Sequence, residues 1–206
     1  MAIVQNPIIG RSSGKLANVI FYTVLEKNII RSKPLVVANP RTIAQQQARV
    51  KLGVLSDLAK LYRTAINIGL KDEAGQMYPR NKFVQINYAA VEVDTSLVVT
   101  ITYEDLFVAK GGNGTLTGVA AAKGATDLVV TWTAIDFTPS TDEVICITYS
   151  DGTIAGTRTR INAATASSGT YTQAASPAQV GDWVYIFMYN LVTLQSSDSV
   201  YVEITA

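Results

Sequence analysis

Short β-forming segments follow one another from about residue 115 to the end of the chain, at roughly the ten-residue spacing of an all-β sandwich. In one of them, Leu128, Val130 and Trp132 share a face, which predicts a tryptophan in a sandwich core. The single cysteine, Cys146, cannot form the disulfide of antibody domains, so the fibronectin type III-like form is favoured over the immunoglobulin form. The predicted strands cover residues 128–133, 143–149, 153–160, 165–171, 183–190 and 199–205, with a hairpin turn at Asp151-Gly152.

A helical pattern comes before this β-rich part and is clearest over residues 39–68. Asn39 before Pro40 is a typical helix start. Thr42 and Gln45 have the spacing of a capping box. Since a surface helix needs only one apolar stripe and this helix has two, we expect burial on two sides, by its own domain or by a partner chain. The stripes are Val50, Val54, Leu58, Leu61 and Ala65, and Leu52, Leu55, Ala59, Tyr62 and Ile66.

The remaining elements complete an α+β prediction with two domains. We expect an arm over residues 1–9, a polar loop over 10–14 and a β-hairpin formed by residues 16–24 and 28–32. A second helix is predicted over residues 81–91 and a half-exposed strand over 95–103. The flexible segment Gly111-Gly112-Asn113-Gly114 predicts a boundary between a strand-and-helix assembly module, residues 1–110, and the sandwich, residues 111–206. We expect residues 115–206 to fold alone.

Charge is divided unevenly along the chain. Residues 1–82 hold thirteen Lys and Arg against four Asp and Glu, whereas residues 83–206 hold four against twelve. Such a division suggests that the basic half contacts a polyanion or that copies of the chain meet through opposite charges. The candidate contact residues, on or beside the predicted helix, are Arg41, Arg49, Lys51, Lys60 and Arg63. The expected partners are other copies of the chain or other proteins, with nucleic acid as a further candidate and no membrane.

The sequence points away from catalysis. It has no histidine, which is the usual general base near neutral pH and the commonest metal ligand. The Gly10 to Lys15 loop has the wrong glycine spacing for a phosphate-binding loop. Carboxylates at Glu104-Asp105, Asp142-Glu143 and Asp151 are expected to be solvated groups at turns. We therefore expect no catalytic residues, metal or other cofactor, and neither a signal peptide nor a membrane span.

Two segments and the chain end resemble a known family. They are residues 1–11 with the strand pair ending Arg31-Ser32-Lys33-Pro34, then Asn39-Pro40-Arg41-Thr42 with its following residues, and finally Ser197-Asp198-Ser199-Val200-Tyr201. They resemble an uncharacterised family of proteins, about as long as this chain, from Bacteroidota and their phages. The Asn-Pro-Arg-Thr helix start also resembles segments of phage structural proteins.

The family implies no known activity and supplies no catalytic residues. The resemblance to phage structural proteins, together with the missing catalytic motifs and the divided charge, predicts a non-enzymatic structural protein of a phage particle, assembled in the bacterial cytoplasm. Its partners would be other copies of the chain or other virion proteins. It would be a capsid-decorating protein or a head-to-tail ring component. A bacterial carbohydrate- or protein-binding module of the same architecture is the leading alternative, and a DNA-associated protein that uses the basic half is the third.

Overall fold

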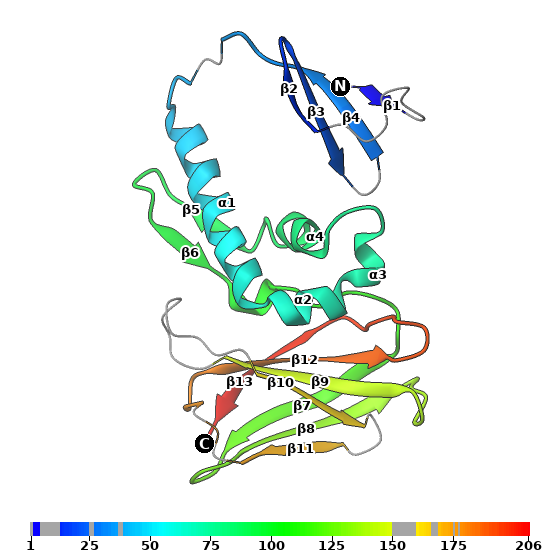
Figure 1. The fold of residues 1–206 in the computed structure, drawn as a ribbon. Coiled ribbons are helices and arrows are strands. Elements are labelled where there is room, and N and C mark those ends of the chain that lie inside the picture. Colours follow the sequence, from blue (N-terminus) through cyan, green and yellow to red (C-terminus); the bar gives the residue numbers. More distant parts are fainter. Residues whose placement is uncertain are drawn as a thin grey trace. The chain divides into compact units, whose positions relative to one another are not determined.

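The computed structural model describes residues 2–4, 13–24, 27–36, 39–149, 160–165, 169–174, 176 and 178–206. The chain forms two compact units, residues 1–42 and residues 43–206. The first unit is a four-stranded antiparallel sheet with the order β1-β4-β3-β2 (Figure 1). Its strands are β1 (Ala2–Val4), β2 (Gly14–Leu16), β3 (Val19–Val24) and β4 (Lys27–Ser32).

The predicted N-terminal hairpin is confirmed as β3 and β4, which pair from Val19 with Ser32 to Val24 with Lys27. The predicted loop over residues 10–14 is wrong at its end, because Gly14 pairs with Phe21 as the first residue of β2. The predicted arm is likewise wrong at residues 2–4, since backbone pairing with β4 makes them a strand. Residues 5–9 lie outside the described residues.

The second unit begins with a helical layer and a small hairpin. Its elements are α1 (Ile43–Leu61), α2 (Arg63–Gly69), α3 (Lys71–Ala74), α4 (Pro79–Ile86), β5 (Val91–Val93), β6 (Val99–Ile101) and a 3-10 turn over Tyr103–Asp105. The predicted long helix is confirmed over most of its length, although it starts at Ile43 and is interrupted at Tyr62. The late start follows from the backbone of Arg41, whose φ of 51° is not helical.

The predicted second helix is wrong in its C-terminal half, because α4 ends at Ile86 and β5 starts at Val91. The cause is Asn87, which is fully buried. Its side chain donates to the carbonyl of Phe107 (2.9 Å) and accepts from the amide of Phe107 (2.7 Å). An asparagine side chain that pairs with distant backbone competes with continuation of a helix.

A seven-stranded sheet follows, with the order β10-β9-β12-β13-β7-β8-β11 (Figure 1). All neighbours are antiparallel except β13 and β7, which pair in parallel. The strands are β7 (Thr115–Lys123), β8 (Leu128–Ile135), β9 (Asp142–Tyr149), β10 (Arg160–Thr165), β11 (Thr170–Gln173), β12 (Trp183–Asn190) and β13 (Val200–Thr205).

Most predicted strands of this sheet are confirmed, but two details are wrong. β7 was not predicted, because its small residues lack a clear alternation and its register with β8 shifts between Thr117 and Ala120. The predicted strand over residues 165–171 corresponds to the end of β10 and the start of β11. The predicted turn at Asp151-Gly152 and residues 153–159 lie outside the described residues.

The central strands β9 and β12 are buried on both faces. On one face Cys146 and Ile186 pack in a core that contains the fully buried Leu128, together with Val130 and Trp132, which confirms the predicted burial of this tryptophan. On the other face Ile145, Ile147, Tyr185 and Phe187 pack in a second core. That core also contains the helical side chains Leu55, Leu58, Ala59, Tyr62, Ala65, Ile66 and Phe83.

The helical layer and the sheet therefore share one core. Packing within the unit buries both predicted stripes of the long helix in its C-terminal half, whereas Leu52 remains 46% exposed. The ring of Tyr185 lies edge-on to that of Tyr62, with centroids 5.6 Å apart, and the Tyr185 hydroxyl donates to the carbonyl of Tyr103 (2.7 Å). The predicted boundary after residue 110 stays a prediction, and it does not coincide with the division between residues 42 and 43.

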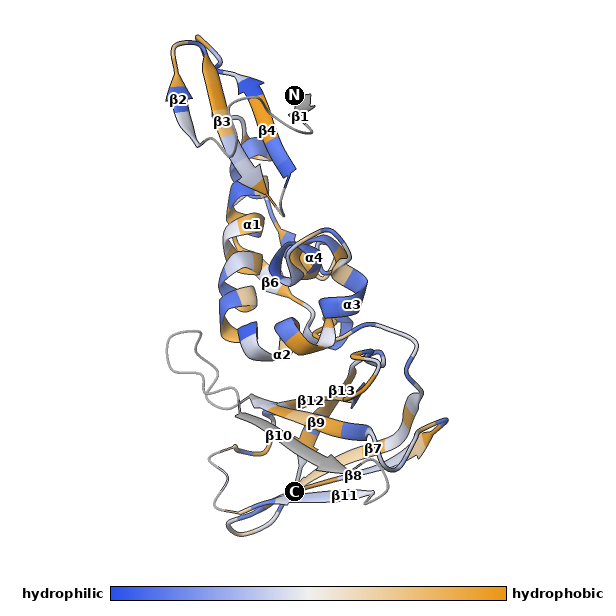
Figure 2. Cartoon of the chain, turned by 45° about the vertical axis from the view of Figure 1, so that its right-hand side comes forward, coloured by the Kyte–Doolittle hydropathy of each residue, from blue (hydrophilic) through white to orange (hydrophobic). Residues whose placement is uncertain are grey.

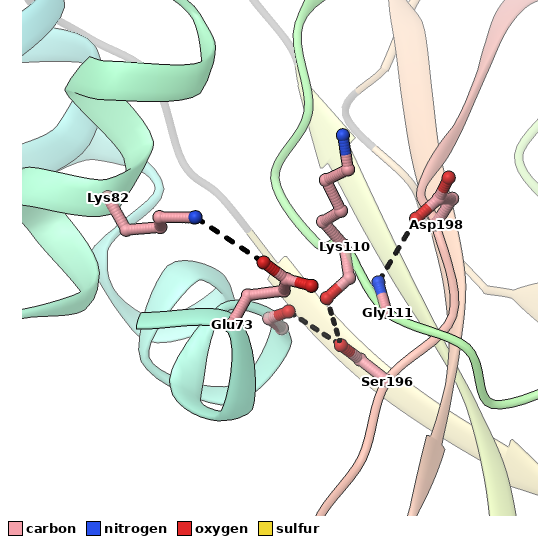
Figure 3. A network of polar contacts seen from close by, with 7 residues as sticks. Glu73, Lys82, Lys110, Gly111, Ser196 and Asp198 are labelled. Atoms are coloured by element: carbon pink, nitrogen blue, oxygen red, sulfur yellow. Dashed lines mark hydrogen bonds and ion pairs between the residues drawn. The ribbon is translucent and has the colours of Figure 1, made fainter. Parts of the chain in front are cut away.

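Hydrogen bonds join the end of α2 to the loop after β12 (Figure 3). The buried Ser196 hydroxyl donates to the carbonyl of Gly69 (2.6 Å), and the Lys110 amide donates to the same carbonyl (3.1 Å). The Gly111 amide donates to Asp198 Oδ1 (3.0 Å). A β-carbon at Gly69 would overlap Ala109, so the close approach requires glycine there.

We expect Gly69→Ala to destabilise the second unit by about 1–3 kcal/mol, because the added methyl group must displace packed backbone. The matched control is Gly53→Ala in the exposed part of α1, where nothing lies within 4 Å of the added carbon. This control should stabilise the helix by about 0.5–1 kcal/mol. Thermal melts followed by tryptophan fluorescence check both changes. Equal effects of the two substitutions would contradict the close approach.

We expect residues 115–206 alone to lack a cooperative thermal transition, although the strand pattern predicts that they fold by themselves. Removal of the helices would expose Ile145, Ile147, Tyr185 and Phe187. At about 1.5–3 kcal/mol for each large side chain, this loss is comparable to the whole stability of a domain, about 5–15 kcal/mol. Calorimetry of residues 115–206 beside residues 43–206 measures the difference. A cooperative melt of the shorter chain would contradict this expectation and support the predicted boundary near residue 111.

Candidate functional site

The five residues that the sequence proposed for polyanion or protein contact belong to different elements of the structure. Arg41 lies in the first unit, just before α1, and is exposed. Arg49, Lys51 and Lys60 lie on α1, and Arg63 is the first residue of α2. Lys51 Nζ lies 4.1 Å from the centroid of the Tyr88 ring. Such a cation–π contact occupies Lys51 within its own unit.

The structure brings Lys60 and Arg63 together at a groove between the α1–α2 break and the start of α4. The groove encloses about 450 Å³. It also includes Arg80, in the first turn of α4, which the sequence analysis did not single out. The lining residues are Ala59, Lys60, Arg63, Ile66, Asn67, Tyr78, Pro79, Arg80 and Asn81, and none is acidic.

The three cations of this groove are weakly neutralised. Lys60 Nζ lies 2.7 Å from Asp57 Oδ1, but both side chains are more than half exposed, and such surface pairs contribute little. The described residues provide no acidic partner within 4.0 Å for Arg63 or Arg80. Nor does the first turn of α4 contain an acidic residue, although that position favours one. We call this site the basic groove.

The sequence contained a signal for Arg80 that charge counting did not use. Tyr78-Pro79-Arg80-Asn81 places a proline at the first helical position, which predicts a helix that starts there. Arg80 would then lie at one end of a short helix rather than in an irregular segment. Its position next to Arg63, however, depends on how α4 packs against α1 and α2, and local sequence does not specify that packing.

The only thiol of the chain is not poised for chemistry. Cys146 points into the core between β8, β9 and β12 and is 1% exposed. Desolvation by burial raises the pKa of its thiol to about 12. Because the thiolate is the nucleophilic form, Cys146 is a structural residue at neutral pH.

The carboxylates predicted at turns divide into two kinds. The prediction that Asp142 is solvated is wrong, because its side chain is buried at the start of β9. Its Oδ1 accepts from Asn190 Nδ2 (2.6 Å), and its Oδ2 accepts from the amide of Thr138 (2.6 Å). Asp142 therefore holds the ends of β9 and β12 together. Glu104 and Asp105 are exposed, as predicted.

Other chemical features are limited to what the described residues contain. Within them, no three His, Cys, Asp or Glu side chains are grouped closely enough to hold a metal ion. A hollow of about 330 Å³ beside Gly111 and Gly114 includes Asp136 and Asp198 in its lining. No helix of the described chain has the length and apolar character needed to cross a bilayer.

Comparison with models of known protein families and with curated proteins gives no match for this chain.

We expect Cys146 to resist alkylation by iodoacetamide at pH 7 in the folded protein and to react once the protein is denatured. Burial keeps the reagent away from the sulfur atom and, by raising the pKa of the thiol, leaves almost no reactive thiolate at this pH. Mass spectrometry of the chain after labelling with and without guanidinium measures this difference. Rapid native labelling would contradict the position of Cys146 between the strands.

Proposed function

We propose that the protein is a non-enzymatic structural protein that assembles through residues 1–42 with other copies of itself or with other proteins of a phage particle. The observation that carries the proposal is the unburied apolar surface of the first unit. None of the side chains described between residues 13 and 42 is fully buried. A small sheet whose described side chains form no buried core needs a covering surface to be stable.

The apolar side chains of this sheet lie on both of its faces. Val19, Phe21 and Ile30 share one face, since Phe21 lies directly opposite Ile30 in the register of β3 and β4. Tyr22 and Ile29 form the corresponding pair on the other face. Hydrophobic residues cover much of β3 and part of β4 (Figure 2). A sheet that is solvated on one side normally alternates apolar with polar residues, and β3 does not.

Charge supports the same kind of partner. Residues 1–42 contain a single acidic residue, Glu26, and six Lys and Arg. Residues 83–206 hold four Lys and Arg against twelve Asp and Glu, so another copy offers a surface of opposite charge. A contact between different surfaces of identical chains is heterologous, and it generates a ring where its rotation closes. Such contacts suit a ring or a decorating layer of a particle.

The β-rich part fits this role through its strand order. We propose that β11-β8-β7 and β13-β12-β9-β10 form the two facing layers of an immunoglobulin or fibronectin type III-like sandwich, with the parallel β7–β13 pair at the change of layer; the strand order of the seven-stranded sheet supports this proposal. The packing of Trp132 against Val184, Ile186 and Met188 in one core supports two facing layers. The setting in a phage particle rests on the sequence resemblance. The alternative, a bacterial carbohydrate- or protein-binding module, uses the same scaffold.

We expect Phe21→Ser and Ile30→Ser, which remove one cross-strand apolar pair, to shift the chain from assemblies towards monomers. Sedimentation velocity over a range of protein concentrations measures the shift, at low and at high salt. Arg31→Glu should weaken assembly mostly at low salt. At physiological ionic strength, salt screens the attraction between exposed charges that are more than about 8 Å apart.

The matched control is Thr23→Ser, an exposed position on the same strand that should leave assembly unchanged. Both tryptophans, Trp132 and Trp183, lie in the second unit, so a fluorescence melt reports separately whether that unit stays folded. A wild-type chain that remains monomeric at every concentration would contradict self-assembly. Capture of a carbohydrate by that monomer would favour the alternative.

A further inference from the structure

We propose that the basic groove binds single-stranded nucleic acid, with phosphates held by Lys60, Arg63 and Arg80 and a base stacked on Tyr78. This site is separate from the sheet of residues 1–42, so it does not depend on self-assembly. Its lining residues all come from the second unit and span only residues 59–81. It is therefore complete within one chain.

Cations from three elements converge on the basic groove. Lys60 lies in the last turn of α1, Arg63 begins α2 and Arg80 lies in the first turn of α4. Like charges that face one hollow repel each other, and no acidic residue lines this hollow. Asp57, outside the lining, pairs with Lys60 alone, through an exposed contact that offsets only part of the repulsion. A bound anion removes that cost. Arginine suits a phosphate in particular, because its planar fork donates two parallel hydrogen bonds.

The groove is also lined by polar, apolar and aromatic side chains. The side chains of Asn67 and Asn81 add donors and acceptors, while Ala59 and Ile66 supply buried apolar surface. Tyr78 is 53% exposed at the groove, although an aromatic ring gains most from burial. An exposed aromatic ring beside a basic groove is the combination that proteins use for single strands, where bases stack on rings and cations follow the backbone.

The basic groove suits a nucleotide phosphate better than the carboxylates of an acidic peptide. An acidic peptide would use the three cations but would leave the Tyr78 ring without a partner. A nucleotide unit uses both the cations and the ring, since its phosphate and its base lie at opposite ends of a sugar. The volume of about 450 Å³ lies in the range of sites for small ligands, about 300–1,000 Å³.

The test measures binding of a fluorescent oligothymidylate to the intact chain by anisotropy, over a series of salt concentrations. Arg63→Gln and Arg80→Gln should each weaken binding about tenfold, as expected for loss of a charge-assisted hydrogen bond. Each should also lower the salt dependence by about 0.7 in the logarithmic slope. Tyr78→Ala should weaken binding about tenfold with the slope unchanged.

The matched control is Lys71→Gln, which removes one exposed positive charge from α3 outside the groove. It should change affinity less than about twofold, because only the long-range field is altered. Fluorescence melts of each variant, which report on the second unit through Trp132 and Trp183, confirm that folding is unchanged. Equal losses for Lys71→Gln and Arg63→Gln would overturn the assignment to the groove.

Two competing ligands are tested in the same assay. Inorganic phosphate should compete only weakly, because it lacks the base that stacks on Tyr78. Polyglutamate should displace the oligonucleotide only as strongly as expected from its negative charge. This displacement should be the same for the wild-type chain and for Tyr78→Ala. Tight binding of polyglutamate without binding of the oligonucleotide would overturn the proposal in favour of an acidic protein segment. Binding of phosphate alone would assign the groove to a free anion and overturn it as well.

Discussion

The two-sided burial of β9 and β12 is the constraint on which the second unit depends. Successive side chains of a strand point to opposite faces, so the alternate residues of these strands enter two different cores. Cys146 and Ile186 close the core of the sheet, while Ile147 and Tyr185 close the core beneath the helices. Consecutive residues of β12, from Val184 to Met188, are therefore all buried.

Because of this arrangement, the C-terminal half of α1 and α2 expose little apolar surface that a partner could contact. Tyr62 and Ile66 are buried in the core that the helices share with the sheet, and Gly69 allows α2 to approach Ala109. Two surfaces of the described residues are the candidates for contact with a partner. One is the apolar, basic sheet of residues 1–42, and the other is the basic groove around Arg63. The proposed assembly and the proposed nucleic-acid contact use these two surfaces separately.

The candidate site was partly predictable. Lys60 and Arg63 could be singled out because they lie on or beside a helix that the sequence predicts. Arg80 did not stand out, because its relation to Arg63 depends on the packing of α4 rather than on chain distance. Lys51 is predicted to contact a partner, and no pattern in the sequence indicated that it also lies over the Tyr88 ring of its own unit. Charge along a sequence therefore locates a basic surface, but not the residues that meet on it.

The sequence by itself determined the local elements: the hairpin of β3 and β4, most of α1, and strands such as β12, whose apolar runs have no alternative to burial. It also determined the division of charge. Only the tertiary structure decided that the helices complete the core of the sheet, that Asn87 ends α4, and that Asp142 is buried. The physical reason is that periodicity reports which side chains leave water, whereas long-range packing decides what they meet.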